Sequence, residues 1–175
     1  MSVAVGAKAP DFALPDTEGG QHSLDGGAAL ATVVVFTCNH CPYALAWQDR
    51  INDAARDYAD RGVRFFAINP NDADRYPRDS YEAMQQRVRD EDWPLPYLRD
   101  ESQAVARDYG AQVTPDLFVI DGNGVVRYRG APDADYADPS QGGAWLRAAL
   151  DAVLDERDLD PAETDPVGCS IKWKP

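Results

Sequence analysis

The six residues Thr37-Cys38-Asn39-His40-Cys41-Pro42 place two thiols only two residues apart. A pair at this spacing can close into a small disulfide ring, open again, and pass two electrons to another thiol or disulfide. The thiolate is the form of cysteine that attacks a disulfide or a peroxide, and an ordinary free thiol titrates near pH ~8.5. The motif therefore predicts dithiol chemistry in surroundings that favour a thiolate.

Local context predicts different roles for the two cysteines. Cys38 is expected at a strand-to-helix junction, where unpaired N–H groups and the helix dipole lower a thiol pKa. His40, when protonated, would stabilise the Cys38 thiolate further, although it can also be a solvated residue without a role. Cys41, one turn later, is expected to be the more buried, resolving thiol. Because Pro42 follows directly, the helix can instead begin near Cys41, which weakens the dipole effect on Cys38.

A metal site is the main alternative for a Cys-x-x-Cys pair. Structural zinc needs four ligands, usually from two such pairs, and this chain has no second pair. Only Cys169, His22 and His40 remain as further thiol or imidazole groups. We therefore predict no bound metal, and keep a Cu(I) metallochaperone as an alternative from another class, since thiolates and imidazole suit soft ions.

Apolar runs and turn residues place the motif within a larger pattern. We predict strands at 31–36, 63–69, 117–121 and 125–130, helices at 42–61, 80–90, 102–109 and 144–154, and a short extended piece at 95–98. A small hairpin or irregular lead-in precedes them over 9–24. Strand-helix-strand units that give way to an antiparallel hairpin predict an α/β fold with a mixed sheet flanked by helices. We expect one domain over 1–175, with 161–175 as an irregular tail.

Composition narrows the function further. The chain has 175 residues, 44% hydrophobic and 27% charged, and a net charge of -13, which argues against nucleic acid or an anionic membrane as a partner. No apolar stretch approaches the ~20 residues of a membrane span, and the first eight residues lack the apolar core of a signal peptide. A cytoplasmic location is expected, where a close cysteine pair is more often catalytic or metal-binding than structural. No glycine-rich phosphate loop is present, so no organic cofactor is predicted. Nothing in the composition assigns an oligomeric state.

Thr114-Pro115 is the second notable element, directly before the predicted strand 117–121. A cis peptide in a tight turn here would leave the N–H and C=O of Thr114 free to pair with an incoming chain. An ordinary trans bond is the alternative, since only ~5% of such bonds are cis.

Several motifs in a fixed order then carry a resemblance. They are Ala9-Pro10-Asp11-Phe12, Phe36 to Pro42, Val113-Thr114-Pro115, and Phe118-Val119-Ile120-Asp121 with Gly124 and Arg129-Gly130. Together they resemble a thioredoxin-fold redoxin of the AhpC/TSA superfamily, which includes TlpA/ResA-like thiol–disulfide oxidoreductases and peroxiredoxins. The segment Gly168 to Lys174 is similar to the ending of a redoxin subgroup with this Cys-Asn-His-Cys-Pro site.

The resemblance implies a thioredoxin-like fold with a nucleophile at Cys38, a resolving thiol at Cys41, and a cis-proline at Pro115 facing them. We expect His40 to assist them. Contacts with substrate are expected at Thr114, Asn39 and Thr37. The implied activity is thiol–disulfide exchange, with protein or small-molecule disulfides and a thiol reductant as partners.

This sequence departs from related patterns in ways that leave alternatives open. Thioredoxins carry a tryptophan where Thr37 stands, and a buried aspartate on the preceding strand. Strand 31–36 has no acid, so the proton acceptor for Cys41 is unassigned. A peroxiredoxin needs a threonine three residues before its peroxidatic cysteine, a spacing that Thr37 does not meet, so a thiol peroxidase is the second hypothesis. Cys169 is either a third redox thiol that reaches the Cys38 site or a buried small hydrophobe.

Overall fold

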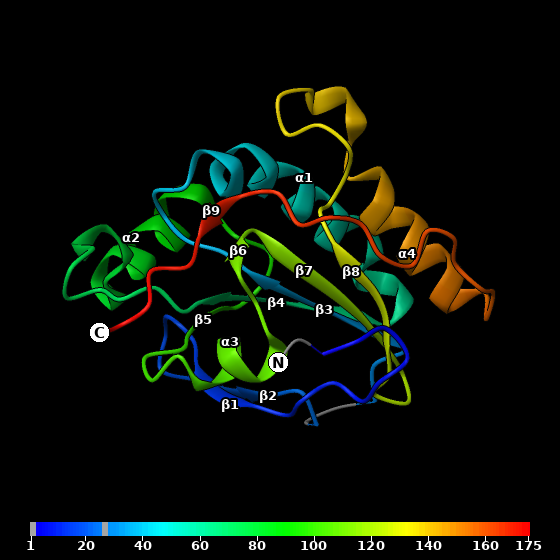
Figure 1. The fold of residues 1–175 in the computed structure, drawn as a ribbon, viewed down its shortest axis with the longest axis horizontal. Helices are drawn as coiled ribbons and strands as arrows, with labels where there is room; N and C mark the ends of the chain where they lie inside the picture. The colour runs from blue at the N-terminus through cyan, green and yellow to red at the C-terminus, as the bar shows by residue number, and fades with distance from the viewer. Residues whose placement is uncertain (1–2, 26–27) are drawn as a thin grey trace.

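The computed structural model describes residues 3–25 and 28–175 (Figure 1). Met1 and Ser2, part of the stretch considered for a signal peptide, lie outside the described residues. The strands are β1 (Ala13–Pro15), β2 (Gln21–Ser23), β3 (Ala31–Phe36), β4 (Val63–Asn69), β5 (Tyr97–Arg99), β6 (Val113–Thr114), β7 (Asp116–Asp121), β8 (Val126–Gly130) and β9 (Cys169–Ser170). The helices are α1 (Pro42–Tyr58), α2 (Tyr81–Glu91), α3 (Ala104–Tyr109) and α4 (Ala144–Leu154).

The central sheet has five strands in the order β5-β4-β3-β7-β8. β3, β4 and β5 run parallel, while β7 pairs antiparallel with β3 and β8 with β7, so the predicted mixed sheet is confirmed. All six residues of β3 are buried because it lies in the middle of a sheet that is covered on both faces. The proline-rich piece at 95–98 leads into the edge strand β5, where a missing N–H is tolerated.

Alternation along β3 divides the core between the two faces of the sheet. Ala31, Val33 and Val35 pack with α1 and α4 in one cluster. Val34 and Phe36 point to the other face and pack with α3 and the β1–β2 hairpin. Figure 1 shows the same layers, with α1 and α4 on one side of the sheet and α3 with the hairpin on the other.

Two helix boundaries show how backbone conformation limits the predicted spans. The predicted helix 42–61 consists of α1 and a 3₁₀ turn over Ala59–Arg61, which ends at Gly62 with φ 76°. The third helix begins at Ala104 instead of 102, because Gln103 takes a left-handed conformation with φ 66°. The second helix, predicted over 80–90, spans Tyr81–Glu91, because Ser80 is its N-cap and accepts a hydrogen bond from the N–H of Ala83.

The two ends of the chain pack differently from one another. β1 and β2 form an antiparallel hairpin that confirms the predicted N-terminal extension. The tail is less irregular than expected over 161–175, because β9 pairs antiparallel with β6. Among the described helices, none is long and apolar enough to cross a membrane.

A buried aspartate fixes the loop between β8 and α4 against α1. Asp133 is 1% exposed, and its carboxylate accepts hydrogen bonds from Trp47 Nε1 at 2.8 Å and from the Arg50 guanidinium at 3.0 Å. The N–H of Gly143, just before α4, donates to the same group at 2.9 Å. One carboxylate therefore ties α1 to the start of α4.

We expect Asp133→Ala to lower the free energy of unfolding by about 3–5 kcal/mol, because it leaves the buried Arg50 guanidinium without its counter-ion. Urea denaturation followed by circular dichroism measures the loss. Asp53→Ala, which removes an exposed pair with Arg56, is the matched control and should cost less than about 0.5 kcal/mol. Equal losses in the two variants would contradict a special role for Asp133.

Candidate functional site

The segment Thr37 to Cys41, called the cysteine loop below, joins the end of β3 to the start of α1. α1 begins at Pro42, and Cys41 is its N-cap residue in an extended conformation. Cys38 therefore lies ahead of the helix, and the expected direct effect of the helix N-terminus on Cys38 falls instead on Cys41. Both cysteines are buried, at 1% and 0% exposure, so burial does not distinguish the nucleophile from the resolving thiol.

The segment Val113-Thr114-Pro115, called the proline loop below, contacts both sulfurs. The Thr114–Pro115 peptide bond is cis, in agreement with the resemblance. Cys38 Sγ lies 3.3 Å from Thr114 Oγ1, and Cys41 Sγ lies 3.1 Å from the carbonyl oxygen of Thr114. Residues 76 positions apart in the chain are thus in direct contact at one site.

The two thiols titrate as a pair, since each sulfur is a hydrogen-bond partner of the other. The Cys38 thiol lowers the pKa of Cys41, while the Cys41 thiol and burial raise the pKa of Cys38. Thr114 and the backbone N–H of His40 act in the opposite direction and lower the pKa of Cys38. The pair therefore loses its first proton easily and holds the second one, so one negative charge is shared between two sulfurs.

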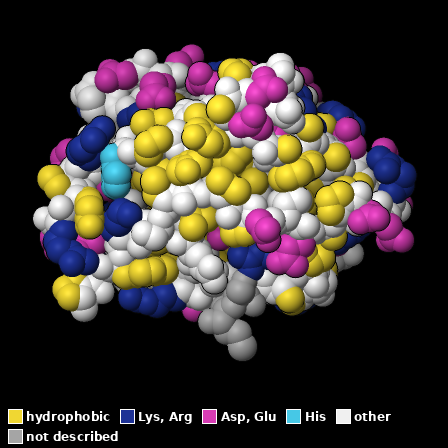
Figure 2. Space-filling view, turned by 45° about the horizontal axis from the view of Figure 1, so that its top comes forward, with side chains coloured by type: hydrophobic (Ala, Val, Ile, Leu, Met, Phe, Trp, Pro, Cys, Tyr) yellow, Lys and Arg dark blue, Asp and Glu magenta, His cyan; other side chains and the backbone are white. Residues whose placement is uncertain are grey.

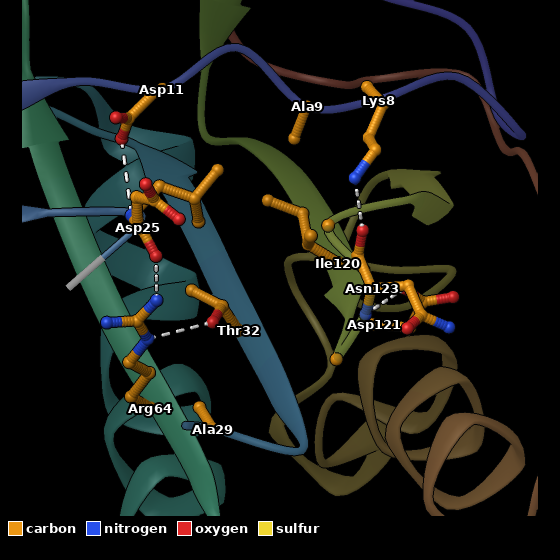
Figure 3. A pocket seen from close by; sticks show the side chains of 13 residues that line it. Lys8, Ala9, Asp11, Asp25, Ala29, Thr32, Arg64, Ile120, Asp121 and Asn123 are labelled. Atoms are coloured by element: carbon orange, nitrogen blue, oxygen red, sulfur yellow. Dashed lines mark hydrogen bonds between the residues drawn. The ribbon is translucent and has the colours of Figure 1, made fainter. Parts of the chain in front are cut away.

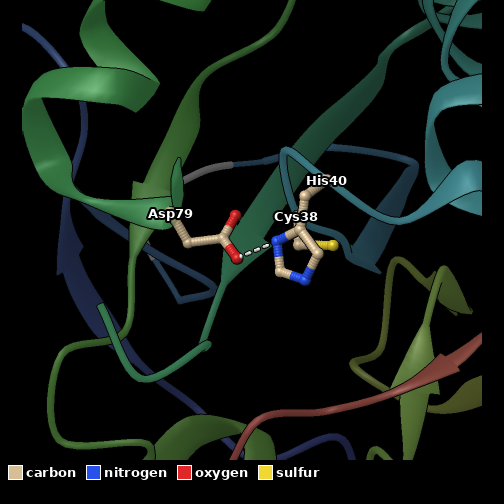
Figure 4. A group of neighbouring side chains, drawn as sticks. All are labelled: Cys38, His40 and Asp79. Atoms are coloured by element: carbon tan, nitrogen blue, oxygen red, sulfur yellow. Dashed lines mark ion pairs between the residues drawn. The ribbon is translucent and has the colours of Figure 1, made fainter. Parts of the chain in front are cut away.

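His40 is oriented by a buried carboxylate that the sequence did not point to. His40 Nδ1 lies 2.6 Å from Asp79 Oδ2, and the side chain of Asp79 is 0% exposed. Figure 4 shows the imidazole between this carboxylate and the sulfur of Cys38. Tyr76 stacks on the ring, with centroids 5.8 Å apart and planes at 8°. Held in this way, His40 presents its ring beside the redox pair.

Asp79 organises the whole loop through further hydrogen bonds. It accepts from the N–H of Asn39 at 2.7 Å, from Asn69 Nδ2 at 3.1 Å and from Asn71 Nδ2 at 3.0 Å. These three donors use acceptor positions on both oxygens, and the His40 ring lies against Oδ2, which is how a carboxylate without solvent contact stays stable. Asp79 belongs to the polar segment 70–80, and no local pattern distinguishes it from the other acids there.

Arg87 is a second residue that sequence reasoning missed. Its guanidinium donates to the carbonyl oxygen of Cys38 at 3.0 Å and to Asn39 Oδ1 at 3.1 Å. Tyr97 also donates to Asn39 Oδ1, at 2.8 Å. The side chain of Asn39 therefore supports the loop, and Thr37 is fully buried. The predicted contacts of these two residues with a substrate stay predictions.

The expected free edge at Thr114 is occupied in this structure. β9 pairs with β6 so that Cys169 lies opposite Thr114 and Ser170 opposite Val113. Cys169 is half-buried and packs against the Cys38 and Cys41 cluster. Cys169 therefore lies at the site, and both predicted roles, a third redox thiol and a buried small hydrophobe, stay open.

Cys38, His40 and Asp79 also offer three ligand atoms within 4.8 Å of one another. Sulfur, imidazole and carboxylate are ligands that zinc accepts. However, Asp79 already receives hydrogen bonds on both oxygens, so ligation would break contacts that hold the loop. The geometry therefore adds little support for a metal site, and the absence of a metal stays a prediction.

A separate cavity of about 270 Å³ lies at the other end of the central sheet (Figure 3). It is lined by Thr32 near the start of β3, Arg64 near the start of β4 and Asp121 at the end of β7. Cys38 follows the opposite end of β3. No cysteine is among the described residues that line this cavity, and all three cysteines of the chain lie together at the other site.

Asp116, immediately after the cis-proline, is buried, and only one of its two carboxylate oxygens has hydrogen-bond or ion-pair partners among the described residues. Its Oδ2 accepts from the N–H of Gln112 at 3.3 Å and lies 3.5 Å from the Arg129 guanidinium. Oδ1 is buried without a hydrogen-bond partner among the described residues. Burial raises the pKa of Asp116 to about 6, against the lowering effect of Arg129.

Comparison with known proteins gives the family. The model of the AhpC/TSA family matches residues 5–129. The chain belongs to the AhpC/TSA family. This family member is 29% identical over 126 residues to the thiol-disulfide oxidoreductase ResA of Geobacillus thermodenitrificans (strain NG80-2), a match that covers 72% of this chain and 68% of ResA.

Solved structures confirm the fold of this AhpC/TSA member. An uncharacterized conserved protein from Geobacillus kaustophilus superimposes with a TM-score of 0.92 at 42% identity, over 98% of this chain and 93% of the other. A Chlorobium tepidum protein provisionally identified as the thiol:disulfide interchange protein DsbE gives 0.71 at 25% identity, over 87% and 99%. The fold is thioredoxin-like, and the family and its relatives make this protein an oxidoreductase.

The raised pKa of Asp116 predicts a pH-dependent loss of stability. The native state holds the proton more tightly than the unfolded chain, so this contribution is complete below pH ~4 and is lost as pH rises through about 6. Asn mimics the neutral acid, so Asp116→Asn should gain about 2–3 kcal/mol relative to wild type between pH 4 and pH 7. Urea denaturation at several pH values gives the two curves, and parallel curves would contradict the prediction.

The negative charge of Asp79 gives a prediction about the pKa of the Cys38 thiol. Its carboxylate raises the pKa of Cys38, so Asp79→Asn should make Cys38 lose its proton at lower pH. The rate of alkylation by iodoacetamide, followed against pH with peptide mapping, measures this shift. A shift to higher pH would mean that the orientation of His40 outweighs the direct charge effect.

Proposed function

We propose that this protein is a thiol–disulfide oxidoreductase that cycles Cys38 and Cys41 between a dithiol and a disulfide. The observation that carries the proposal is the contact of both sulfurs with Thr114, directly before the cis-proline. In this arrangement a substrate sulfur brought to the proline loop meets the redox pair. The ResA relative adds support at the level of the family.

The proposed cycle starts from one thiolate shared by two sulfurs. As Cys38 attacks a substrate disulfide, its proton passes to Cys41, the Cys38–substrate bond forms, and the first substrate thiolate leaves. That leaving thiolate takes the proton from Cys41. In this cycle the leaving thiolate is therefore the proton acceptor for Cys41, a role for which β3 offers no acidic side chain. The Cys41 thiolate then attacks Cys38, closes the internal disulfide, and releases the second substrate thiolate, which takes a proton from water.

Two neighbouring groups favour the charged form of Cys38 during attack, against the larger raising effects of the Cys41 thiol and of burial on its pKa. The hydroxyl of Thr114 and the backbone N–H of His40 lower its pKa. Arg87 binds the carbonyl oxygen of the same residue, which keeps a positive charge close to the loop. A thiol reductant regenerates the dithiol by the reverse exchange, and the proposal needs no organic cofactor.

The surface around the pair favours a protein disulfide as substrate. Figure 2 shows hydrophobic side chains gathered on a face that also carries a histidine. Tyr43 packs against the cysteine cluster and contacts the exposed Tyr136, with ring centroids 4.4 Å apart. On the other side, the exposed Tyr76 stacks on His40. Apolar and aromatic groups around a reactive centre suit a polypeptide better than a small charged disulfide.

The cytoplasm remains the proposed compartment.

A thiol peroxidase is the second candidate function, and the position of Thr37 and Arg87 beside Cys38 supports it. The Thr37 hydroxyl is buried without a hydrogen-bond partner among the described residues, and Arg87 lies close to Cys38. A threonine hydroxyl and an arginine are the groups that the peroxiredoxin pattern uses. Here, however, Arg87 is already bonded to the Cys38 carbonyl oxygen and to Asn39.

Insulin reduction with dithiothreitol tests the proposed function. Wild type should accelerate the appearance of insulin precipitate, and Cys38→Ser should lose this activity by more than about 100-fold because the nucleophile is gone. Cys41→Ser should accumulate a mixed disulfide between Cys38 and insulin, visible by mass spectrometry. Ser102→Ala, an exposed change outside the contacts of the cysteine cluster, is the control for handling of the variants.

The same proteins decide between the two candidates. Reduced wild type is mixed with hydrogen peroxide in a stopped-flow instrument, with fluorescence of the buried Trp47 as the signal. Oxidation no faster than that of an ordinary thiol supports disulfide exchange. Rapid oxidation by stoichiometric peroxide, without insulin reduction, would replace the proposed function by a peroxidase.

A further inference from the structure

The C-terminal segment crosses the redox site in the manner of a bound peptide. Figure 1 shows the tail returning from α4 across the sheet to place β9 beside β6. Cys169 lies opposite Thr114, and the N–H of Ile171 donates to the carbonyl oxygen of Gln112 at 3.0 Å. The pairing is antiparallel and follows the strand that ends at the cis-proline, which is the edge where an extended substrate would add.

Contacts beyond β9 hold this segment in register. Ile171 is 3% exposed within the core cluster that includes Phe36. The backbone of Lys172 receives a hydrogen bond from Gln103 Nε2 at 2.9 Å and donates one to Asn71 Oδ1 at 2.9 Å. Several independent contacts therefore position Cys169, rather than the two residues of β9 alone.

The docked tail leaves no space for another chain at Thr114. Gly168 passes so close to the Thr114 carbonyl that a Cβ at this position would overlap it. The same carbonyl oxygen is the partner of Cys41 Sγ. Gly168 therefore permits a close approach that brings the next residue, Cys169, to the sulfur of Cys41.

Cys41 is the middle member of a row of three sulfurs. The thiols of Cys38 and Cys169 each lower the pKa of Cys41 by hydrogen bonding to it. Burial, and then the Cys41 thiol, raise the pKa of Cys169. Cys41 has the largest effect on the pKa of Cys38, and Cys169 is not among the main groups that shift it. Cys169 instead hydrogen-bonds to Cys41 through both its thiol and its backbone, and it packs against the cluster of Cys38 and Cys41. The order Cys38–Cys41–Cys169 makes Cys41 the sulfur that both others can reach.

We propose that Cys169 is a third redox-active residue of this site, which exchanges with the Cys38–Cys41 disulfide by forming a Cys41–Cys169 disulfide. This inference rests on the proposed function. The Cys169 thiolate, after releasing its proton to water, attacks Cys41 Sγ, the Cys41–Cys169 bond forms, and the Cys38–Cys41 bond breaks. Cys38 leaves with the electron pair and takes up a proton, so the step needs no external oxidant or reductant.

The exchange has a consequence for access to the site. In the Cys41–Cys169 isomer the tail is covalently fixed over Thr114, while Cys38 is a thiol again although the protein remains oxidised by two electrons. The Thr114 edge is therefore closed to a second chain in this isomer. In the Cys38–Cys41 isomer the tail is held by non-covalent contacts only, which an incoming chain can displace.

Variants that leave two cysteines each test the connectivity. Cys38→Ser and Cys41→Ser are treated with oxidised glutathione, quenched in acid, alkylated with N-ethylmaleimide and mapped by mass spectrometry. Cys38→Ser should form an internal Cys41–Cys169 disulfide, while Cys41→Ser should remain a glutathione adduct. Stable glutathionylation of Cys38→Ser, or equal internal closure in both variants, overturns the proposal.

Gly168→Ala in the Cys38→Ser background tests whether docking of the tail positions the thiol. The added methyl should displace β9 and slow internal disulfide formation by about tenfold or more, since Cys169 loses its high local concentration. An unchanged rate overturns the role of β9. Oxidised wild type, mapped in the same way, should contain both the Cys38–Cys41 and the Cys41–Cys169 linkage, and a map with the first alone also overturns the proposal.

These readouts separate the inference from the proposed function. Failure of wild type to reduce insulin refutes the proposed function even when Cys38→Ser closes its internal disulfide. Normal insulin reduction combined with a glutathione adduct in Cys38→Ser refutes the third redox residue and leaves the proposed function in place.

Discussion

The antiparallel pairing of β3 with β7 is the constraint on which the site depends. Phe36, the last residue of β3, lies opposite Asp116, the first residue of β7. Because the strands run in opposite directions, the residues after Phe36 must lie beside the residues before Asp116. The cysteine loop and the proline loop meet for this reason, and a slip by one residue would also turn every core side chain to the wrong face.

A single buried carboxylate gives the cysteine loop its shape. Asp79 lies near the end of the polar segment 70–80 and directly precedes the capping residue of α2, where the positive end of a helix favours a negative charge. Its donors come from the cysteine loop, from the end of β4 and from the segment after it. The loop is thus built around one charge rather than around apolar packing, and this allows a histidine to be held beside two thiols in a site with little solvent.

The sequence predicted the elements with strong local patterns and missed the contacts between distant polar residues. β3 and α4 follow from their apolar spacing, and the start of α1 follows from Pro42, which is tolerated only in the first turn. The cis bond at Pro115 was expected from the resemblance, since local rules alone favour trans.

Asp79, Arg87 and the pairing of β9 could not be predicted in this way. Asp79 is one of several acids in a polar segment, and its partners lie up to 40 positions away along the chain. Arg87 looks like an ordinary surface residue of an amphipathic helix until the fold turns it toward the Cys38 carbonyl. β9 has two residues, too few for an alternating pattern, and its position depends on contacts with several other elements.

The hydrogen bond from Asn39 to Asp79 also bears on how the site opens in solution. The N–H of Asn39 belongs to no helix or strand, yet it is bonded to a carboxylate that has no contact with solvent. This proton can exchange with deuterium only when the loop separates from Asp79. The exchange rate of one amide therefore reports how often the cysteine loop leaves its support, even while the sheet and helices stay folded.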